Sequence, residues 1–150
     1  MYQKILVPLD GSDLAKCTLL HVESLISRGF AGEVTLLNIV KLDIPWAEMY
    51  AGRRPLDLDG LRKTLFAKSR KYLEKISSQL NSKGIEVKTE ALEANRPAYT
   101  IIGYAEKNKM DLIVMATHGH SGFKKLLLGS VAFGVLQESN IHVLLIRPEA

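Results

Sequence analysis

Short apolar runs alternate with longer amphipathic stretches along the whole of this chain. Most of the apolar runs are rich in Ile, Leu and Val with little polar interruption, which is typical of parallel strands covered on both faces. Such alternation predicts one parallel sheet with helices packed on both faces. The expected strands are residues 4–9, 33–40, 86–92, 112–116 and 143–146, and the expected helices are residues 13–28, 61–82, 129–138 and one that starts near Pro97.

Right-handed crossovers leave few ways to arrange five such units. We expect a Rossmann-like α/β fold: a doubly wound five-stranded parallel sheet, with strand order 3-2-1-4-5, in one domain of 150 residues. Ligands of such sheets bind at the carboxyl ends of the strands, where the winding direction changes. Here that point lies between the first and fourth strands, where Asp10 and Ala116 should meet.

A glycine-containing segment follows the fourth strand. The apolar run ending at Met115 leads into the polar residues 117–122, and Gly129-Ser130 opens the next helix. Glycine lets the backbone approach a ligand closely, and the first N–H groups of a helix attract anions. The stretch from Met115 to Leu136 therefore predicts a phosphate or nucleotide site, in which Ser130 either contacts a phosphate or caps its own helix.

A carboxylate follows the first strand at the same edge of the sheet. Asp10 precedes Gly11-Ser12, and this position is suited to ligand contact. The alternative is that Asp10 or Ser12 caps the following helix, a role that Asp13 could also take. The two uses are compatible.

Composition excludes several classes of protein. The net charge is +4 and the pI is about 9.2, which suits anionic ligands, but no long Lys/Arg run is present, so nucleic-acid binding is not expected. No apolar stretch reaches 18 residues, so no membrane span is expected. The single cysteine, Cys17, and an N-terminus without a signal-peptide pattern favour the cytoplasm. Cys17 and His21 lie four residues apart, but no third metal ligand is near them in sequence, so we interpret them as packing residues.

The chain contains neither the P-loop motif nor G-x-G-x-x-G, so the P-loop and dinucleotide-binding interpretations are weak. Instead, the spacing of Gly119, nine residues and then Gly129-Ser130 resembles the signature of universal stress proteins, which is G-x-x-G, nine residues and G-S or G-T. Residues 7–12, 111–115 and 143–148 are also similar to that family. The sequence departs from the signature at Ala116, where the first glycine would stand.

This resemblance implies a universal stress protein domain over residues 1–150, from the branch that binds ATP, sometimes with Mg²⁺ or Mn²⁺ on the phosphates. It implies an adenine contact at Ile39 and a homodimer formed by pairing of residues Val143 to Ile146 across a two-fold axis. The nucleotide-binding positions that it implies are Pro8, Leu9, Asp10, Ile39, Met115, Ala116, Gly119, Gly129 and Ser130. We also expect His120, Ser121, Gly122 and Val131 in the site, because the backbone of residues 119–122 should supply N–H donors to phosphates.

Three functional hypotheses remain open from the sequence. The first is a regulatory ATP-binding module without turnover, which we favour. The second is a slow ATPase or phosphotransferase, for which His118, His120 and Asp10 are the only candidate groups. The third is a dimeric scaffold that binds no nucleotide.

The effect of Ala116 depends on its backbone: a negative φ costs little, whereas a positive φ costs about 1 kcal/mol or more. The long segment 41–59 is interpreted as a surface loop, although Trp46 could fold over a ligand.

Overall fold

Five parallel strands form a single sheet in the order β3-β2-β1-β4-β5, as predicted. The computed structural model describes residues 1–13, 15–42, 57–118 and 128–148. The strands differ from the expected ones by no more than two residues at either end, and β1 and β2 each begin two residues earlier than expected. They are β1 (Tyr2–Leu9), β2 (Ala31–Val40), β3 (Val87–Glu93), β4 (Leu112–Ala116) and β5 (His142–Ile146).

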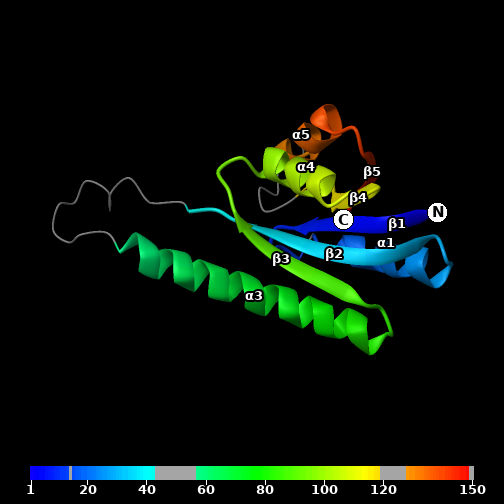
Figure 1. Cartoon of the computed structure of the whole chain (residues 1–150), viewed down its shortest axis with the longest axis horizontal. Helices are drawn as coiled ribbons and strands as arrows, with labels where there is room; N and C mark the ends of the chain where they lie inside the picture. Colours follow the sequence, from blue (N-terminus) through cyan, green and yellow to red (C-terminus); the bar gives the residue numbers. More distant parts are fainter. Residues whose placement is uncertain (14, 43–56, 119–127, 149–150) are drawn as a thin grey trace.

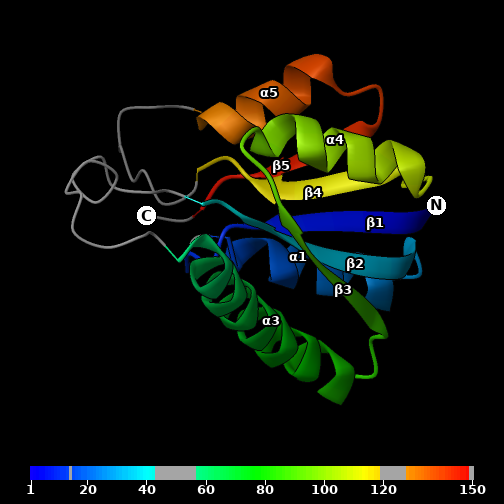
Figure 2. The same cartoon turned by 60° about the vertical axis from the view of Figure 1, so that its left-hand side comes forward.

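Helices cover both faces of the sheet (Figure 1). Helices α1 (Cys17–Ser27) and α3 (Leu58–Ser82) lie on one face, and α4 (Pro97–Lys107) and α5 (Ser130–Glu138) lie on the other. Figure 2 shows the same two layers from a second direction, with β1 in the middle of the sheet. The predicted doubly wound α/β fold is therefore confirmed.

Alternate residues of the central strands fill two separate cores. In β1, Ile5 and Val7 pack toward α1 and α3, whereas Leu6 packs toward α4 and α5. All three side chains are fully buried. This two-sided burial explains why residues 5–9 of β1 and 112–115 of β4 are uninterrupted apolar runs, because neither face of these segments meets water.

Two of the helices end in left-handed glycines. Gly29 follows α1 with φ of 75°, and Gly84 follows α3 with φ of 81°. In each case the next residue donates its N–H to a carbonyl five residues back: Phe30 to Leu25, and Ile85 to Leu80. This is the Schellman arrangement, in which a glycine at the C′ position adopts the positive φ at little cost.

Two helix starts differ from the prediction. Helix α1 begins at Cys17 rather than Asp13, because the residues before it form tighter turns, such as the one closed by the amide of Lys16 and the carbonyl of Asp13. Helix α3 begins earlier than predicted, at Leu58, where the carboxylate of Asp57 accepts a hydrogen bond from the amide of Gly60. A side-chain cap of this kind supplies an acceptor for an otherwise unpaired amide.

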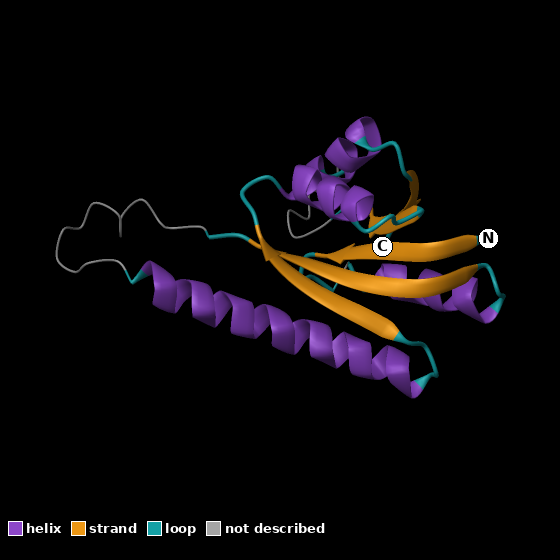
Figure 3. Ribbon diagram, in the orientation of Figure 1, coloured by secondary structure: helices purple, strands orange, loops and turns teal. Residues whose placement is uncertain are grey.

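The buried face of α3 differs from the one that its sequence indicates. Helical spacing of the apolar residues predicts a buried stripe of Leu61, Leu65, Tyr72, Ile76 and Leu80, whereas the buried residues are Ser69, Leu73, Ile76 and Leu80. The first turns of α3 extend beyond the sheet, as Figure 3 shows; Leu61 and Leu65 there are only half-buried, and Leu58 is exposed. The burial of a serine in the middle of the helix was not predicted.

No helix in the described part of the chain is long and apolar enough to cross a membrane.

Candidate functional site

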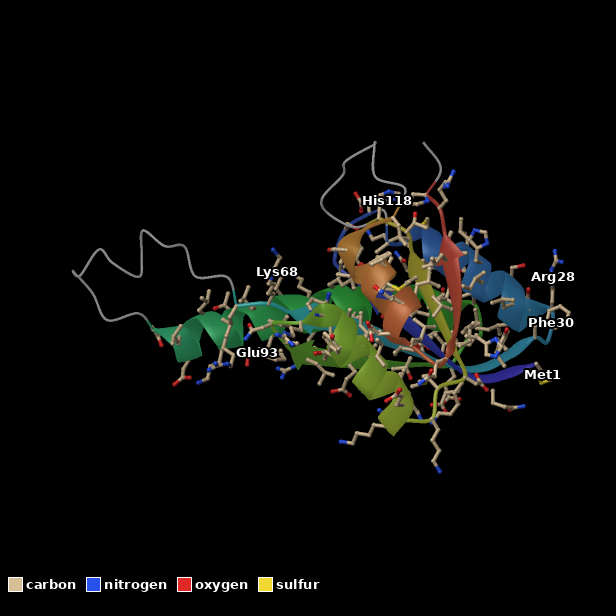
Figure 4. The ribbon with its side chains drawn as sticks, turned by 90° about the horizontal axis from the view of Figure 1, so that it is seen from above. Met1, Arg28, Phe30, Lys68, Glu93 and His118 are labelled. Atoms are coloured by element: carbon tan, nitrogen blue, oxygen red, sulfur yellow. The ribbon has the colours of Figure 1, made fainter. Side chains whose placement is uncertain are left out.

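A cavity of about 370 Å³ opens at the carboxyl ends of β1, β2 and β4. The starts of α4 and α5 close its other sides, and its inner wall is apolar. Figure 4 shows His118 at this end of the molecule, with Met1 and Phe30 at the opposite end. The lining residues are Pro8, Leu9, Asp10, Ala15, Leu37, Ile39, Lys41, Pro97, Ile101, Met115, Ala116, Thr117, His118, Gly129, Ser130, Val131 and Ala132.

The turn after β1 holds the Asp10 carboxylate at the cavity. Asp10 Oδ1 accepts hydrogen bonds from the Ser12 amide at 2.9 Å and from the Ser12 hydroxyl at 2.5 Å. Ser12 Oγ in turn accepts from the amide of Ala15 at 3.2 Å. Gly11 makes the turn possible, because its φ of 86° is disfavoured for other residues. Ser12 thus has a capping role, while Asp10 is exposed and lines the cavity.

The end of β4 forms the facing wall. Among the described residues, Lys109 is the one non-glycine residue with positive φ, so the backbone of Ala116 is unstrained. Of the two cases that the sequence left open, negative or positive φ at Ala116, the structure shows the one in which alanine in place of the signature glycine costs little. Beyond it, the hydroxyl of buried Thr117 lies 2.8 Å from Nδ1 of His118, and this contact fixes one side of the imidazole ring.

Gly129 joins the start of α5 to this wall. Its amide donates a hydrogen bond to the carbonyl of Thr117 at 2.6 Å, and a Cβ at this position would lie 3.0 Å from the same oxygen. The close approach of the two chain segments therefore favours glycine here. Gly129 occupies the N-cap position of α5 and Ser130 is the first helical residue, so the alternative that Ser130 is the N-cap is wrong.

Polar side chains lie behind the cavity, under the turn after β1. The Asn38 side-chain amide donates to the carbonyl of Leu9 at 2.7 Å, and the Ser69 hydroxyl donates to Asn38 Oδ1 at 2.6 Å. The nearby Tyr72 hydroxyl is buried and makes no hydrogen bond of ordinary geometry in the described part of the chain. Burial, followed by the negative charge of Asp10, raises the pKa of Tyr72 to about 12, and the neighbouring amide of Gly11 acts weakly in the opposite direction.

The structure brings together all the predicted site residues that it describes. Pro8, Leu9, Asp10, Ile39, Met115, Ala116, Gly129, Ser130 and Val131 all line the one cavity. The predicted residues Gly119, His120, Ser121 and Gly122, like Trp46, lie outside the described residues. Among the lining residues that sequence reasoning did not select, Lys41 and Pro97 stand directly after β2 and at the start of α4. The signal that could have identified them as cavity residues was their position at the carboxyl edge of the predicted sheet.

The model of the universal stress protein family matches residues 1–147 of this chain. The chain belongs to the universal stress protein family. Universal stress protein MJ0531 of Methanocaldococcus jannaschii is 34% identical over 148 residues, which cover 98% of this chain and 83% of that protein.

Solved structures of the universal stress protein fold agree with this assignment. The structure of MJ0577, from the same organism, has a TM-score of 0.81 and 30% identity, and covers 100% of this chain and 99% of that chain. A family protein from Arabidopsis thaliana with AMP bound has a TM-score of 0.70 and 16% identity, and covers 99% of this chain and 93% of that chain. At that identity the likeness shows the fold alone.

Proposed function

We propose that this universal stress protein domain binds an adenine nucleotide, ATP, in the cavity at the carboxyl edge of the sheet. One observation carries the proposal: the turn that holds Asp10 and the start of α5 at Gly129-Ser130 line the same cavity although they are far apart in sequence. The apolar wall suits a purine base, and the volume of about 370 Å³ is within the range of small-molecule sites.

Each part of the nucleotide has a matching chemical group. The Asp10 carboxylate accepts hydrogen bonds, so it suits the ribose hydroxyls and not the phosphates, as acidic residues do in other α/β nucleotide sites. The first amides of α5 have no acceptors within the helix and suit the phosphates. Ile39, Leu37 and Ile101 offer the apolar surface on which a base would lie.

A divalent cation would bind together with the nucleotide, through its phosphates. Among the described residues, no three His, Cys, Asp or Glu side chains come together in a group that could hold a metal ion. Mg²⁺ commonly uses phosphate oxygens and water with few protein ligands. We therefore propose that Mg²⁺ or Mn²⁺ would bind on the ATP phosphates, where it would neutralise part of their charge.

Regulatory binding without turnover is the form of this function that we favour. The residues that line the cavity include the ionisable groups Asp10, Lys41 and His118. Nδ1 of His118 already faces the Thr117 hydroxyl, and Asp10 Oδ1 already accepts two hydrogen bonds from Ser12. Sustained release of ADP from labelled ATP, abolished in His118→Ala, would instead support the ATPase alternative. No ATP retention at millimolar concentration would support the scaffold.

The first test is mass spectrometry of the nucleotide released from freshly purified protein, followed by calorimetric titration with ATP. We expect Asp10→Asn to weaken ATP binding at least tenfold, because a charge-assisted hydrogen bond to the ribose becomes a neutral one. Asn can still accept the Ser12 hydrogen bonds, so the turn should persist. Asp13→Asn is the matched control, because the Asp13 side chain is 96% exposed. Equal ATP affinity in Asp10→Asn and wild type would count against the proposal.

We also propose a homodimer through β5. This strand is at the edge of the sheet, next to β4, and Leu144 in its centre is 36% exposed. An edge strand that presents apolar side chains and unpaired backbone groups is a template for pairing with a second copy. The cytoplasmic location expected from the sequence remains a prediction.

A further inference from the structure

A chain of buried hydrogen bonds connects the middle of α3 to the peptide bond that leads into Asp10. Ser69 Oγ donates to Asn38 Oδ1 at 2.6 Å, and Asn38 Nδ2 donates to the carbonyl oxygen of Leu9 at 2.7 Å. The Leu9 carbonyl belongs to the Leu9–Asp10 peptide, so this contact holds the backbone that leads into the Asp10 side chain.

These polar groups are enclosed by the core. Asn38 and Ser69 are 8% and 5% exposed, and their neighbours on β2 and α3 are mostly apolar. A buried amide side chain is costly unless it is hydrogen-bonded, and here both ends of the Asn38 amide have partners. Lys68, the residue before Ser69, is exposed on the outer side of α3 (Figure 4). The serine, in contrast, is a polar group that α3 directs toward the sheet.

A second group from the same helix face reaches the same turn. Tyr72 follows Ser69 by three residues, and its buried hydroxyl lies close enough to Asp10 and Gly11 for both to influence its ionisation. Residues three apart on a helix share one face. Helix α3 thus reaches the turn after β1 from Tyr72 and, through Asn38, from Ser69, although these residues are far from Asp10 in the sequence.

We propose that Ser69 is a positioning residue: through Asn38 it fixes the Leu9–Asp10 peptide and so holds the Asp10 carboxylate in the geometry that binds the nucleoside. The carboxylate is exposed and stands on a turn, where backbone motion would otherwise vary its orientation. The Ser12 contacts fix the carboxylate relative to the turn, and the Ser69–Asn38 pair fixes the turn relative to the sheet. This inference rests on the proposed nucleotide site and assigns a residue outside the cavity to it.

The test uses the full chain and three substitutions in α3. Ser69→Ala removes the hydroxyl, Ser69→Thr keeps a hydroxyl, and Ser77→Ala removes a half-buried serine whose contact, with Asn81, stays within the helix. Hydrogen exchange of the Ser12 amide, which is bonded to Asp10 Oδ1, reports the order of the turn without any ligand. We expect exchange to be at least fivefold faster in Ser69→Ala and unchanged in Ser77→Ala, with wild-type behaviour restored by Ser69→Thr.

The second readout is selectivity for the ribose hydroxyls. The ratio of the Kd for 2′,3′-dideoxy-ATP to the Kd for ATP measures how well the Asp10 carboxylate is positioned to bind the ribose hydroxyls. We expect this ratio to fall about fivefold in Ser69→Ala. A general loss of stability would speed exchange throughout the core and leave the ratio unchanged. An unchanged Ser12 exchange rate or an unchanged ratio in Ser69→Ala overturns the proposal. A wild-type protein that binds neither nucleotide overturns the proposed function, and a faster Ser12 exchange in Ser69→Ala would then still establish the coupling of α3 to the turn.

Discussion

The backbone amide of Gly129 donates a hydrogen bond to the carbonyl oxygen of Thr117, with 2.6 Å between the two atoms. This contact joins the start of α5 to the end of β4 and sets one wall of the cavity. A Cβ on residue 129 would lie 3.0 Å from the same oxygen, which is closer than side chains normally approach a carbonyl. The glycine of the family signature therefore has a structural reason that is independent of any ligand.

Gly129→Ala should lower both stability and nucleotide affinity. The added methyl must push α5 away from Thr117, and overpacking of this kind costs about 1–3 kcal/mol. Urea unfolding followed by circular dichroism measures the loss, and titration with ATP measures the change in affinity.

A matched glycine provides the control for that substitution. Gly103 lies within α4, and a Cβ added there meets no atom within 4 Å. Gly103→Ala should raise the free energy of unfolding by about 0.5–1 kcal/mol, because alanine favours the helix. If Gly129→Ala were as stable as Gly103→Ala, the close approach of Gly129 to Thr117 would not be a constraint.

Ala116→Gly restores the glycine of the family signature and should have a small effect. The backbone of Ala116 has no positive φ, so the methyl group causes no strain that glycine would relieve. We expect the ATP affinity to change less than about threefold, and the stability to fall by about 0.5–1 kcal/mol because glycine loses more conformational entropy in a strand. Calorimetric titration and urea unfolding measure the two quantities. A tenfold gain in affinity would mean that the methyl group obstructs the ligand.

Local sequence patterns were sufficient to predict the sheet and part of the cavity. Strands β1 and β4 are apolar runs that end in turns, so the sequence alone placed Asp10 and Ala116 at one edge of the sheet. Lys41 was not selected, because apolar periodicity does not indicate which residue beyond a strand faces the cavity.

The buried polar contacts could not be predicted in the same way. A serine in a charged helix is normally interpreted as part of the solvated face, and Ser69 is buried because Asn38, 31 residues away, supplies its acceptor. Such a pair is set by how α3 packs on the sheet, which a single sequence does not specify. Likewise, the turns that delay α1 until Cys17, such as the one closed by the Lys16 amide and the Asp13 carbonyl, cannot be predicted from helical periodicity.

Tyr72 should make stability depend on pH in the alkaline range. The pKa of Tyr72 is raised from 10 to about 12, chiefly by burial and then by the charge of Asp10 and, more weakly, Asp13. The unfolded chain therefore releases this proton near pH 10, while the folded chain keeps it until about pH 12. The stabilisation is complete below pH 10 and is lost as the pH rises toward 12. Because the ring is only partly buried, we expect a loss of roughly 1 kcal/mol.

Urea unfolding of wild type and Tyr72→Phe between pH 8 and pH 11.5 isolates this effect. Phenylalanine has no proton to lose, so its stability should fall less steeply with pH. Below pH 10 the variant should be as stable as wild type or slightly more stable, because the hydroxyl that is removed is buried and makes no hydrogen bond of ordinary geometry with the described residues. Tyr99→Phe, at a residue that is 59% exposed, is the matched control. Identical slopes for wild type and Tyr72→Phe would contradict the assignment.

Leu144→Glu should separate the proposed homodimer into monomers. Leu144 lies in the centre of the edge strand β5 and is 36% exposed, and a second copy paired along β5 would bury it against its own equivalent. Two glutamates brought together there would be desolvated and would repel each other. Size-exclusion chromatography with light scattering at micromolar concentration should show a dimer for wild type and a monomer for the variant. Leu20→Glu, at a site on α1 that is 69% exposed, should remain dimeric. A monomeric wild type, or a dimeric Leu144→Glu, would place any self-association on another surface.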